Sequence, residues 1–189
     1  MITSETTHPL HVSLGDMHFK KMIDQEEILS RIQAMAAAID GWYKASDFEL
    51  IVVLKGAFIF AADLVRWLKS DSVIHFVHLS SYTGTTSRGK VDVHLGYEGP
   101  VEGRSFLIVE DIVDTGRSIC FLTDMLRKRG AADIRVVALL KKPAAHVEEV
   151  QVDMAGFDIG NEFVVGYGLD YDQAGRNLPH IYRSIPGPA

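Results

Sequence analysis

The residues best suited to chemistry lie in one segment, residues 107–118, with the sequence LIVEDIVDTGRS. Its apolar start ends at two adjacent carboxylates, Glu110 and Asp111, and the turn sequence DTGRS follows before a helical pattern begins. Backbone N–H groups, hydroxyls and the start of a helix bind phosphate well. Carboxylates would repel a phosphate, but they suit sugar hydroxyls or a metal ion. The combination therefore indicates a site for a ribose phosphate.

The elements that must position this segment can be read from apolar patterns. Short runs rich in β-branched residues predict strands at residues 50–54, 73–79, 106–109 and 134–140. Apolar residues at helical spacing predict helices at about 25–44, 57–69 and 119–129. Residues 91–97 alternate as in a hairpin arm, and 163–165 form a short strand-like piece.

The order of these elements is strand, helix, strand, strand, helix, strand. It predicts an α/β fold with a central, mostly parallel sheet flanked by helices. Ligands bind such sheets at the carboxyl ends of the strands, where the carboxylates of residues 107–118 fall. The chain of 189 residues fits a single domain, 1–189.

Composition excludes several classes of protein. The 19 Lys and Arg residues against 25 Asp and Glu residues give a formal net charge of -6, so nucleic acid is not an expected partner. A single cysteine, Cys120, rules out a disulfide within the chain and a Cys-rich zinc site. The most apolar stretch, residues 56–62, is far shorter than the ~20 residues that cross a bilayer. The N-terminus has no secretory signal pattern, so we expect a cytoplasmic protein with no membrane partner.

Residues 107–118 resemble the phosphoribosyl-pyrophosphate (PRPP) signature of the type I phosphoribosyltransferases. Four further segments resemble the 6-oxopurine branch, the hypoxanthine-guanine phosphoribosyltransferases: VLKGAFIF at 53–60, SSY at 80–82, LLKKP at 139–143 and EFVVGYGLDY at 162–171. The resemblance covers roughly residues 20–185. It implies the type I phosphoribosyltransferase fold, with a core at about 24–143 and a small hood from about 1–23 and 144–189.

The implied reaction transfers the 5-phosphoribosyl group of PRPP to N9 of hypoxanthine or guanine, giving IMP or GMP and pyrophosphate. Asp114 would be the catalytic acid or base at purine N7. The remaining PRPP ligands are assigned by resemblance as ribose ligands Glu110 and Asp111, 5′-phosphate ligands Thr115, Gly116, Arg117 and Ser118, and pyrophosphate ligands Lys55, Gly56 and Arg176. A non-proline cis peptide is expected in the Lys55–Gly56 loop.

The resemblance also assigns the purine site, a cofactor and a lid. The purine-binding residues would be Lys142, Phe163, Val164 and Asp170, with Lys142 donating to the 6-oxo group and Phe163 stacking on the base. The cofactor would be Mg²⁺, held by Glu110, Asp111 and Asp170. Ser81 and Tyr82 would begin a loop that closes over the site. From the residues alone, Phe163 in its valine-rich run is more typical of a core position, and Lys142 beside Lys141 is more typical of a solvated pair.

Two alternatives to this function remain at the level of sequence. One is a xanthine-preferring phosphoribosyltransferase, because contacts near purine position 2 are not resolved by one sequence. The other is an RNA-binding regulator with the PRPP fold, which would need a basic face that the charge of -6 disfavours. The expected partners are PRPP, hypoxanthine and guanine, and the resemblance implies a homodimer or homotetramer.

Overall fold

The computed structural model describes residues 8–43, 47–81 and 91–187, which form two sheets and three α-helices. The larger sheet has six strands in the order β5-β4-β3-β6-β7-β8. Their bounds are β3 (Glu49–Leu54), β4 (Val73–Ser81), β5 (Val91–Leu95), β6 (Ser105–Val113), β7 (Asp133–Lys141) and β8 (Met154–Asp158). All neighbouring pairs are parallel except β4 with β5. The predicted α/β class and the antiparallel hairpin arm are therefore confirmed.

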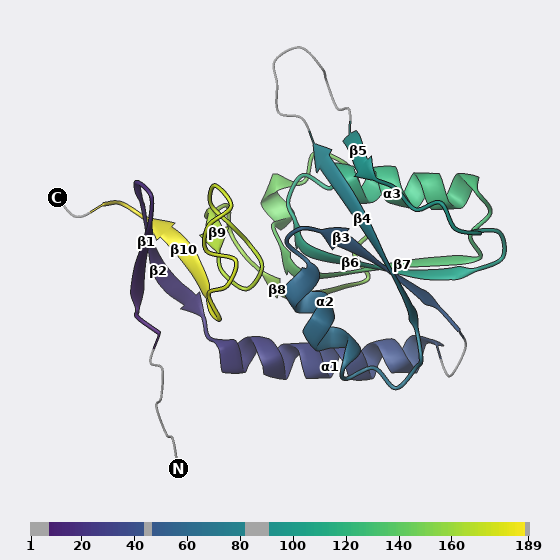
Figure 1. Cartoon of the computed structure of the whole chain (residues 1–189), viewed down its shortest axis with the longest axis horizontal. Helices are drawn as coiled ribbons and strands as arrows, with labels where there is room; N and C mark the ends of the chain where they lie inside the picture. Colours follow the sequence, from purple (N-terminus) through teal and green to yellow (C-terminus); the bar gives the residue numbers. More distant parts are fainter. Residues whose placement is uncertain (1–7, 44–46, 82–90, 188–189) are drawn as a thin grey trace.

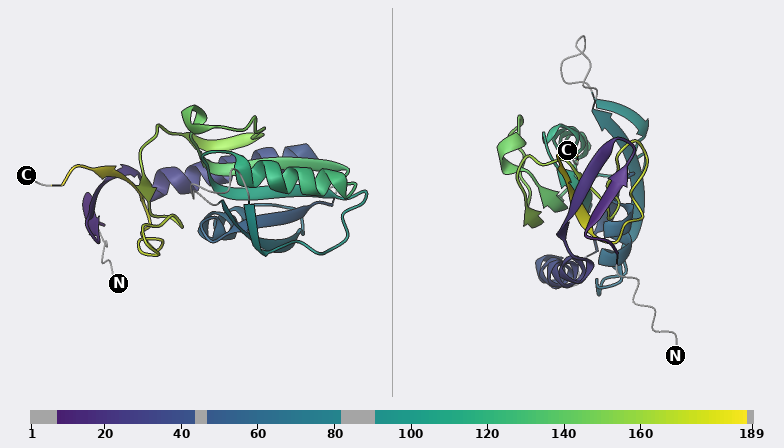
Figure 2. Two further views of the ribbon diagram at one scale, coloured as in Figure 1. Left: turned by 90° about the horizontal axis from the view of Figure 1, so that it is seen from above. Right: turned by 90° about the vertical axis from the view of Figure 1, so that its left-hand side faces the viewer.

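Helices cover both faces of this sheet (Figures 1 and 2). Helices α1 (Gln25–Tyr43) and α2 (Phe58–Val65) pack on one face, and α3 (Arg117–Lys128) packs on the other. The apolar residues at helical spacing that predicted α1 are the side chains that this helix buries, because Ile28, Ile32 and Ile39 are all 0% exposed. Helix α2 is shorter than predicted. The chain leaves it in a turn, and the Lys69 N–H group then donates to Asp40 on α1.

A second sheet lies at one end of the molecule (Figure 1). It is antiparallel, in the order β1-β2-β10-β9, from β1 (His11–Leu14), β2 (Met17–Ile23), β10 (Ile181–Ile185) and β9 (Val164–Val165). Phe19, Val165 and Tyr182 form its own small core, and each is 0% exposed. This sheet is the expected hood, built from the two ends of the chain.

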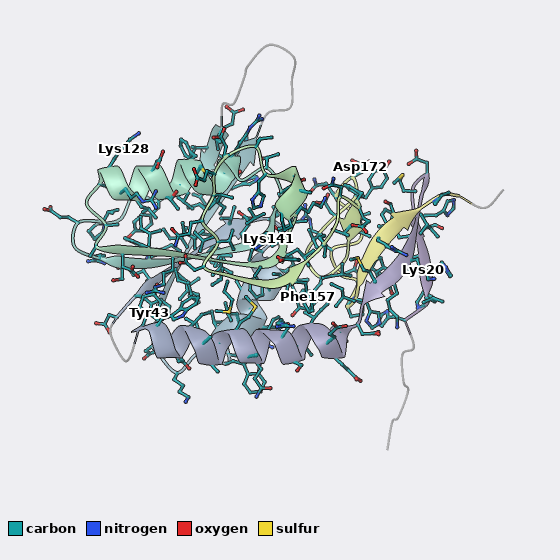
Figure 3. All side chains as sticks on the ribbon, turned by 180° about the vertical axis from the view of Figure 1, so that it is seen from behind. Lys20, Tyr43, Lys128, Lys141, Phe157 and Asp172 are labelled. Atoms are coloured by element: carbon teal, nitrogen blue, oxygen red, sulfur yellow. The ribbon has the colours of Figure 1, made fainter. Side chains whose placement is uncertain are left out.

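The expected boundary between core and hood at residue 143 is wrong for one segment. Strand β8 pairs in parallel with β7 and forms an edge of the large sheet, so it belongs to the core. Phe157 on β8 faces α1, where the guanidinium carbon of Arg31 lies 5.4 Å from the ring centre (Figure 3). The strand was not predicted because its sequence, MAGFD, lacks an apolar β-branched run.

Strand β6 also differs from its prediction in a way that concerns the site. The apolar run was expected to end at Glu110, but β6 continues to Val113. Ile112 and Val113 still pair with Leu140 and Lys141 of β7, so the ladder carries the two carboxylates inside the strand. Among the described residues, no helix is long and apolar enough to span a membrane.

Candidate active site

The turn after β6 lies at the carboxyl end of the strand and leads directly into α3. Gly116 precedes the helix with a φ of 82°, a left-handed conformation that favours glycine. A Cβ atom at this position would lie 2.8 Å from the Cγ1 atom of Val150, so the turn has no room for a side chain. The Cys120 N–H group donates to the Gly116 carbonyl, which starts the helix. The free N–H groups of this first turn can bind an anion.

The two carboxylates of β6 are held in a poorly solvated place. Glu110 is 7% exposed, and burial together with the neighbouring carboxylate raises its pKa well above the ordinary value. Burial also raises the pKa of Asp111, although the Ile112 N–H group donates to its Oδ1 atom at 2.9 Å. Two adjacent buried carboxylates attract hydroxyl donors or a cation, because either partner relieves their repulsion.

The turn after β3 brings Lys55 and Gly56 to the same place. The peptide bond between Leu54 and Lys55 is cis, as expected for this loop. A Cβ atom on Gly56 would lie 1.6 Å from the Oδ2 atom of Asp111, so glycine allows the β3 turn to approach the Asp111 carboxylate. The Nζ atom of Lys55 donates to the Oε1 atom of Gln173 at 3.2 Å.

A loop from the C-terminal part of the chain completes this side. The Oδ1 atom of Asp170 lies 2.6 Å from the Nη2 atom of Arg176, and the Gln173 N–H group donates to Oδ2 of the same carboxylate at 2.8 Å. Arg176 also donates to the Gly168 carbonyl at 2.7 Å. Gly168 in turn lies against Gly56, since a Cβ atom there would be 2.1 Å from the Gly56 carbonyl oxygen. Residues 168–176, called the hood loop below, and the β3 turn therefore hold each other in position.

These elements enclose a cavity of about 330 Å³. Eleven of the predicted site residues line it: Lys55, Gly56, Glu110, Asp111, Asp114, Thr115, Gly116, Arg117, Ser118, Asp170 and Arg176. The sequence analysis missed two polar residues that also line it, Gln173 and His78. Gln173 has a left-handed φ of 66°, and no pattern in the sequence around it predicts this conformation. His78 lies in the apolar strand β4, and the only signal in the sequence is its position near the carboxyl end of that strand.

The predicted purine-binding residues lie beside this cavity. Lys142 is 8% exposed, and its Nζ atom is 3.8 Å from the Oδ2 atom of Asp114, which lines the cavity. Phe163 is 43% exposed, so it is not a core residue, and its ring makes an edge contact with Tyr171 at 5.9 Å. The side chain of Val164 is buried in the main core, while its backbone pairs with Arg183 of β10.

The predicted lid residues are only partly described. Ser81 is the last residue of β4, at the same carboxyl edge of the sheet as the cavity. Tyr82 and the rest of the expected loop lie outside the described residues.

Comparisons with known proteins identify the family of this chain. Residues 20–172 match the phosphoribosyl transferase domain family. The hypoxanthine-guanine phosphoribosyltransferase of Bacillus subtilis is 39% identical over 163 residues, which cover 86% of this chain and 91% of that protein. The bifunctional protein TilS/HprT of Listeria monocytogenes is also 39% identical over 86% of this chain, but the chain spans only 25% of its length.

Solved structures show the same likeness. A hypoxanthine phosphoribosyltransferase from Staphylococcus aureus superposes with a TM-score of 0.84 at 32% identity, covering 88% of this chain and 91% of that one. A hypoxanthine-guanine phosphoribosyltransferase from Bacillus anthracis has a TM-score of 0.83 at 34% identity, covering 88% and 98%. These relatives favour the 6-oxopurine interpretation over the xanthine and RNA-regulator alternatives. The chain belongs to the hypoxanthine-guanine phosphoribosyltransferase family.

Proposed function

We propose that the chain transfers the 5-phosphoribosyl group of PRPP to N9 of hypoxanthine or guanine, forming IMP or GMP and releasing pyrophosphate. The observation that carries this proposal is the convergence of three features on one cavity: paired carboxylates, a glycine turn at a helix start, and two cationic side chains. Each feature matches one part of PRPP, namely the ribose diol, the 5′-phosphate and the pyrophosphate. The identity of the purine substrates is inferred from the relatives, which are named as hypoxanthine-guanine or hypoxanthine phosphoribosyltransferases.

In this proposal the α3 turn binds the 5′-phosphate. Thr115 and Ser118 supply hydroxyl donors, Gly116 lets the phosphate approach the backbone, and the helix start supplies N–H groups. Glu110 and Asp111 accept hydrogen bonds from the ribose 2′- and 3′-hydroxyls, which replaces part of the solvation that these buried groups lack.

Pyrophosphate leaves on the opposite side of the ribose, towards the β3 turn. Lys55 and Arg176 provide positive charge there. Lys55 donates a hydrogen bond to Gln173 of the 168–176 loop, and Arg176, which belongs to that loop, donates to the Gly168 carbonyl. Because Gly56 has no side chain, backbone N–H groups of its turn can approach the leaving oxygens.

Mg²⁺ would bind in this cavity together with oxygens of PRPP, because no three His, Cys, Asp or Glu side chains among the described residues are grouped closely enough to hold an ion by themselves. Glu110, Asp111 and Asp170 offer the oxygen ligands that Mg²⁺ prefers. Burial raises the pKa of Glu110 and of Asp111, and a bound cation would lower both values again. When bound, Mg²⁺ would offset the negative charge that develops on the pyrophosphate. Lys55 and Arg176 would share that task from the protein side.

Purine recognition is assigned to Lys142 and Asp114. N7 and O6 are neighbours on one edge of a 6-oxopurine. The 3.8 Å between the Lys142 Nζ and Asp114 Oδ2 atoms suits that edge, with the ammonium donating to O6 and the carboxylate accepting the N7 proton. The 6-amino group of adenine would instead face the ammonium donor, which selects against adenine.

The proposed reaction needs no reactant besides PRPP and the purine. The C1′–oxygen bond to pyrophosphate breaks, the N9 lone pair forms the bond to C1′, and Asp114 takes the proton from N7. Water would compete for the reactive ribose, so we retain the prediction that the segment beginning at Ser81 and Tyr82 closes over the site.

A steady-state assay with PRPP and Mg²⁺ tests the proposed function. Hypoxanthine and guanine should both be converted, adenine should not, and the same assay measures xanthine. Comparable rates with adenine, or no rate with either oxopurine, would contradict the proposal.

The predicted cytoplasmic location stays a prediction.

Self-association is the second part of this proposal. On β3, Leu50 and Val52 are 0% exposed under the helices, but their register partners on β4, Ile74 and Phe76, are 40% and 48% exposed. The same face of the sheet thus continues beyond its helical cover, and a second copy of the chain would shield it. Analytical ultracentrifugation should find a dimer or tetramer in the unchanged chain, and Phe76→Lys should weaken that assembly. A monomeric unchanged chain would contradict this part.

A further inference from the structure

His78 is a cavity residue for which the proposed mechanism has no role. It lies near the end of β4 and pairs in register with Leu54, the residue before Lys55. Its neighbours in the cavity lining are Lys55 and Gly56 of the β3 turn. An imidazole in this place can donate hydrogen bonds to phosphate oxygens, since it lies on the side where the pyrophosphate is expected.

Two basic side chains act on His78. The ring of His94 on β5 lies 4.8 Å from the His78 ring, centre to centre, and the charge of Lys55 acts on His78 as well. Arg117 and Arg176 line the same cavity, and the carboxylates that line it are Glu110, Asp111, Asp114 and Asp170. Asp92 lies two residues from His94 on β5 and is exposed. The two groups whose charge acts on the pKa of His78, His94 and Lys55, are therefore both basic.

We propose that His78 is a further ligand of the diphosphate group of PRPP and determines how tightly that group is held. This inference rests on the proposed function, because it names an additional residue for the same substrate. A purely structural histidine would instead be satisfied by protein groups and would not respond to a diphosphate.

The electrostatics give the proposal a specific consequence. Burial lowers the pKa of His78, and the nearby His94 and Lys55 lower it further, so the free protein favours the neutral imidazole. A bound diphosphate acts in the opposite direction and favours the protonated ring. Binding should therefore take up a proton at His78, and affinity should fall as pH rises through the pKa of His78 in the complex.

Isothermal titration calorimetry with the whole chain tests this. PRPP and, separately, inorganic pyrophosphate are titrated in the presence of Mg²⁺ between pH 6 and pH 8.5. At the low end, His78→Gln should bind both about tenfold more weakly, as expected for the loss of a charge-assisted hydrogen bond. At the high end the two proteins should converge, because the imidazole of the unchanged chain is then neutral.

Two further variants separate a ligand from a structural residue. His94→Gln removes a basic neighbour that lowers the pKa of His78, so tight binding should persist to higher pH than in the unchanged chain. His78→Lys keeps a positive charge at every pH tested, so it should restore affinity with little pH dependence. Equal affinity and equal pH profiles for His78→Gln and the unchanged chain would overturn the inference. If the unchanged chain fails to bind PRPP at all, the proposed function fails instead.

Discussion

The Cα atom of Gly56 lies so close to the carboxylate of Asp111 that a Cβ atom built on it would be 1.6 Å from the Oδ2 atom. This contact joins the turn after β3 to the carboxylate pair of β6, and so it joins the two halves of the proposed PRPP site. It also explains why the site needs glycine at this position, although the φ of Gly56 is not left-handed. The first prediction follows from this contact.

Gly56→Ala should displace the Asp111 carboxylate or the β3 turn, because the new methyl group and the oxygen cannot occupy the same space. We expect PRPP to bind about tenfold more weakly or worse, since misplaced ligands cost binding steeply. Calorimetry measures this directly. Gly41→Ala in α1 is the matched control, because a Cβ atom there meets nothing within 4 Å. Unchanged PRPP affinity in Gly56→Ala would show that the contact has no functional role.

Asp114→Asn should lower kcat by about 10²- to 10⁴-fold, the usual contribution of a positioned acid or base. The side chain of Asp114 is 51% exposed, so the change should not disturb folding or PRPP affinity. Steady-state kinetics together with PRPP calorimetry separate these effects. Asp124→Asn on α3 is the control, because that carboxylate is 61% exposed and pairs with the exposed Arg127 at 3.6 Å. Equal losses in kcat and PRPP affinity would argue for a structural role of Asp114.

The adjacent lysines offer a sharper comparison. Lys142 is buried next to Asp114, whereas the Nζ atom of Lys141 lies 3.3 Å from Asp158 on β8. Lys142→Met should raise the KM for hypoxanthine roughly 10- to 100-fold, because it removes a charged donor to the 6-oxo group. Lys141→Met should leave that KM within about twofold, since an exposed ion pair contributes little. The reverse result would move the purine site to Lys141.

Glu110→Gln should separate stability from binding. Burial raises the pKa of Glu110, so its ionisation opposes folding, and folding stability should fall as pH rises from the unfolded value towards the raised native value. The neutral amide removes this effect and should raise the free energy of unfolding of the free chain at pH 7.

The same variant should bind PRPP at least about tenfold more weakly, because it loses a charged acceptor of the ribose hydroxyls. Urea denaturation and calorimetry measure the two effects. Glu98→Gln, at an exposed position, should change neither quantity. A less stable Glu110→Gln with normal PRPP affinity would sink this interpretation of the carboxylate pair.

Local sequence determined the strands and helices that carry the phosphate turn. The apolar runs that predicted β3, β6 and β7 belong to strands that are mostly buried, and such runs can be recognised without knowledge of their partners. The run that predicted β4 belongs to a strand whose Ile74 and Phe76 side chains are exposed. The turn after β6 was equally local, because Gly116, the hydroxyl residues and the start of α3 are adjacent in the chain. Their functional interpretation came from the resemblance, which assigned each residue its ligand.

Only the tertiary structure decided the elements whose stability comes from their partners. The hood strands and β8 have no strong pattern of their own, and they form because β2 pairs with β10 and β7 pairs with β8. The same holds for the carboxylates inside β6. Its ladder with β7 continues past Glu110 and Asp111, so the prediction that the strand ends at a charge was wrong.

The composition of the cavity was likewise decided in three dimensions. Lys55 and Gln173 are 118 positions apart, and the hydrogen bond between them depends on how the hood loop folds back onto the β3 turn. His78 belongs to the cavity because β4 ends beside β3. Sequence patterns report the preferences of neighbouring residues along the chain, whereas contacts between distant segments depend on packing that no local pattern encodes.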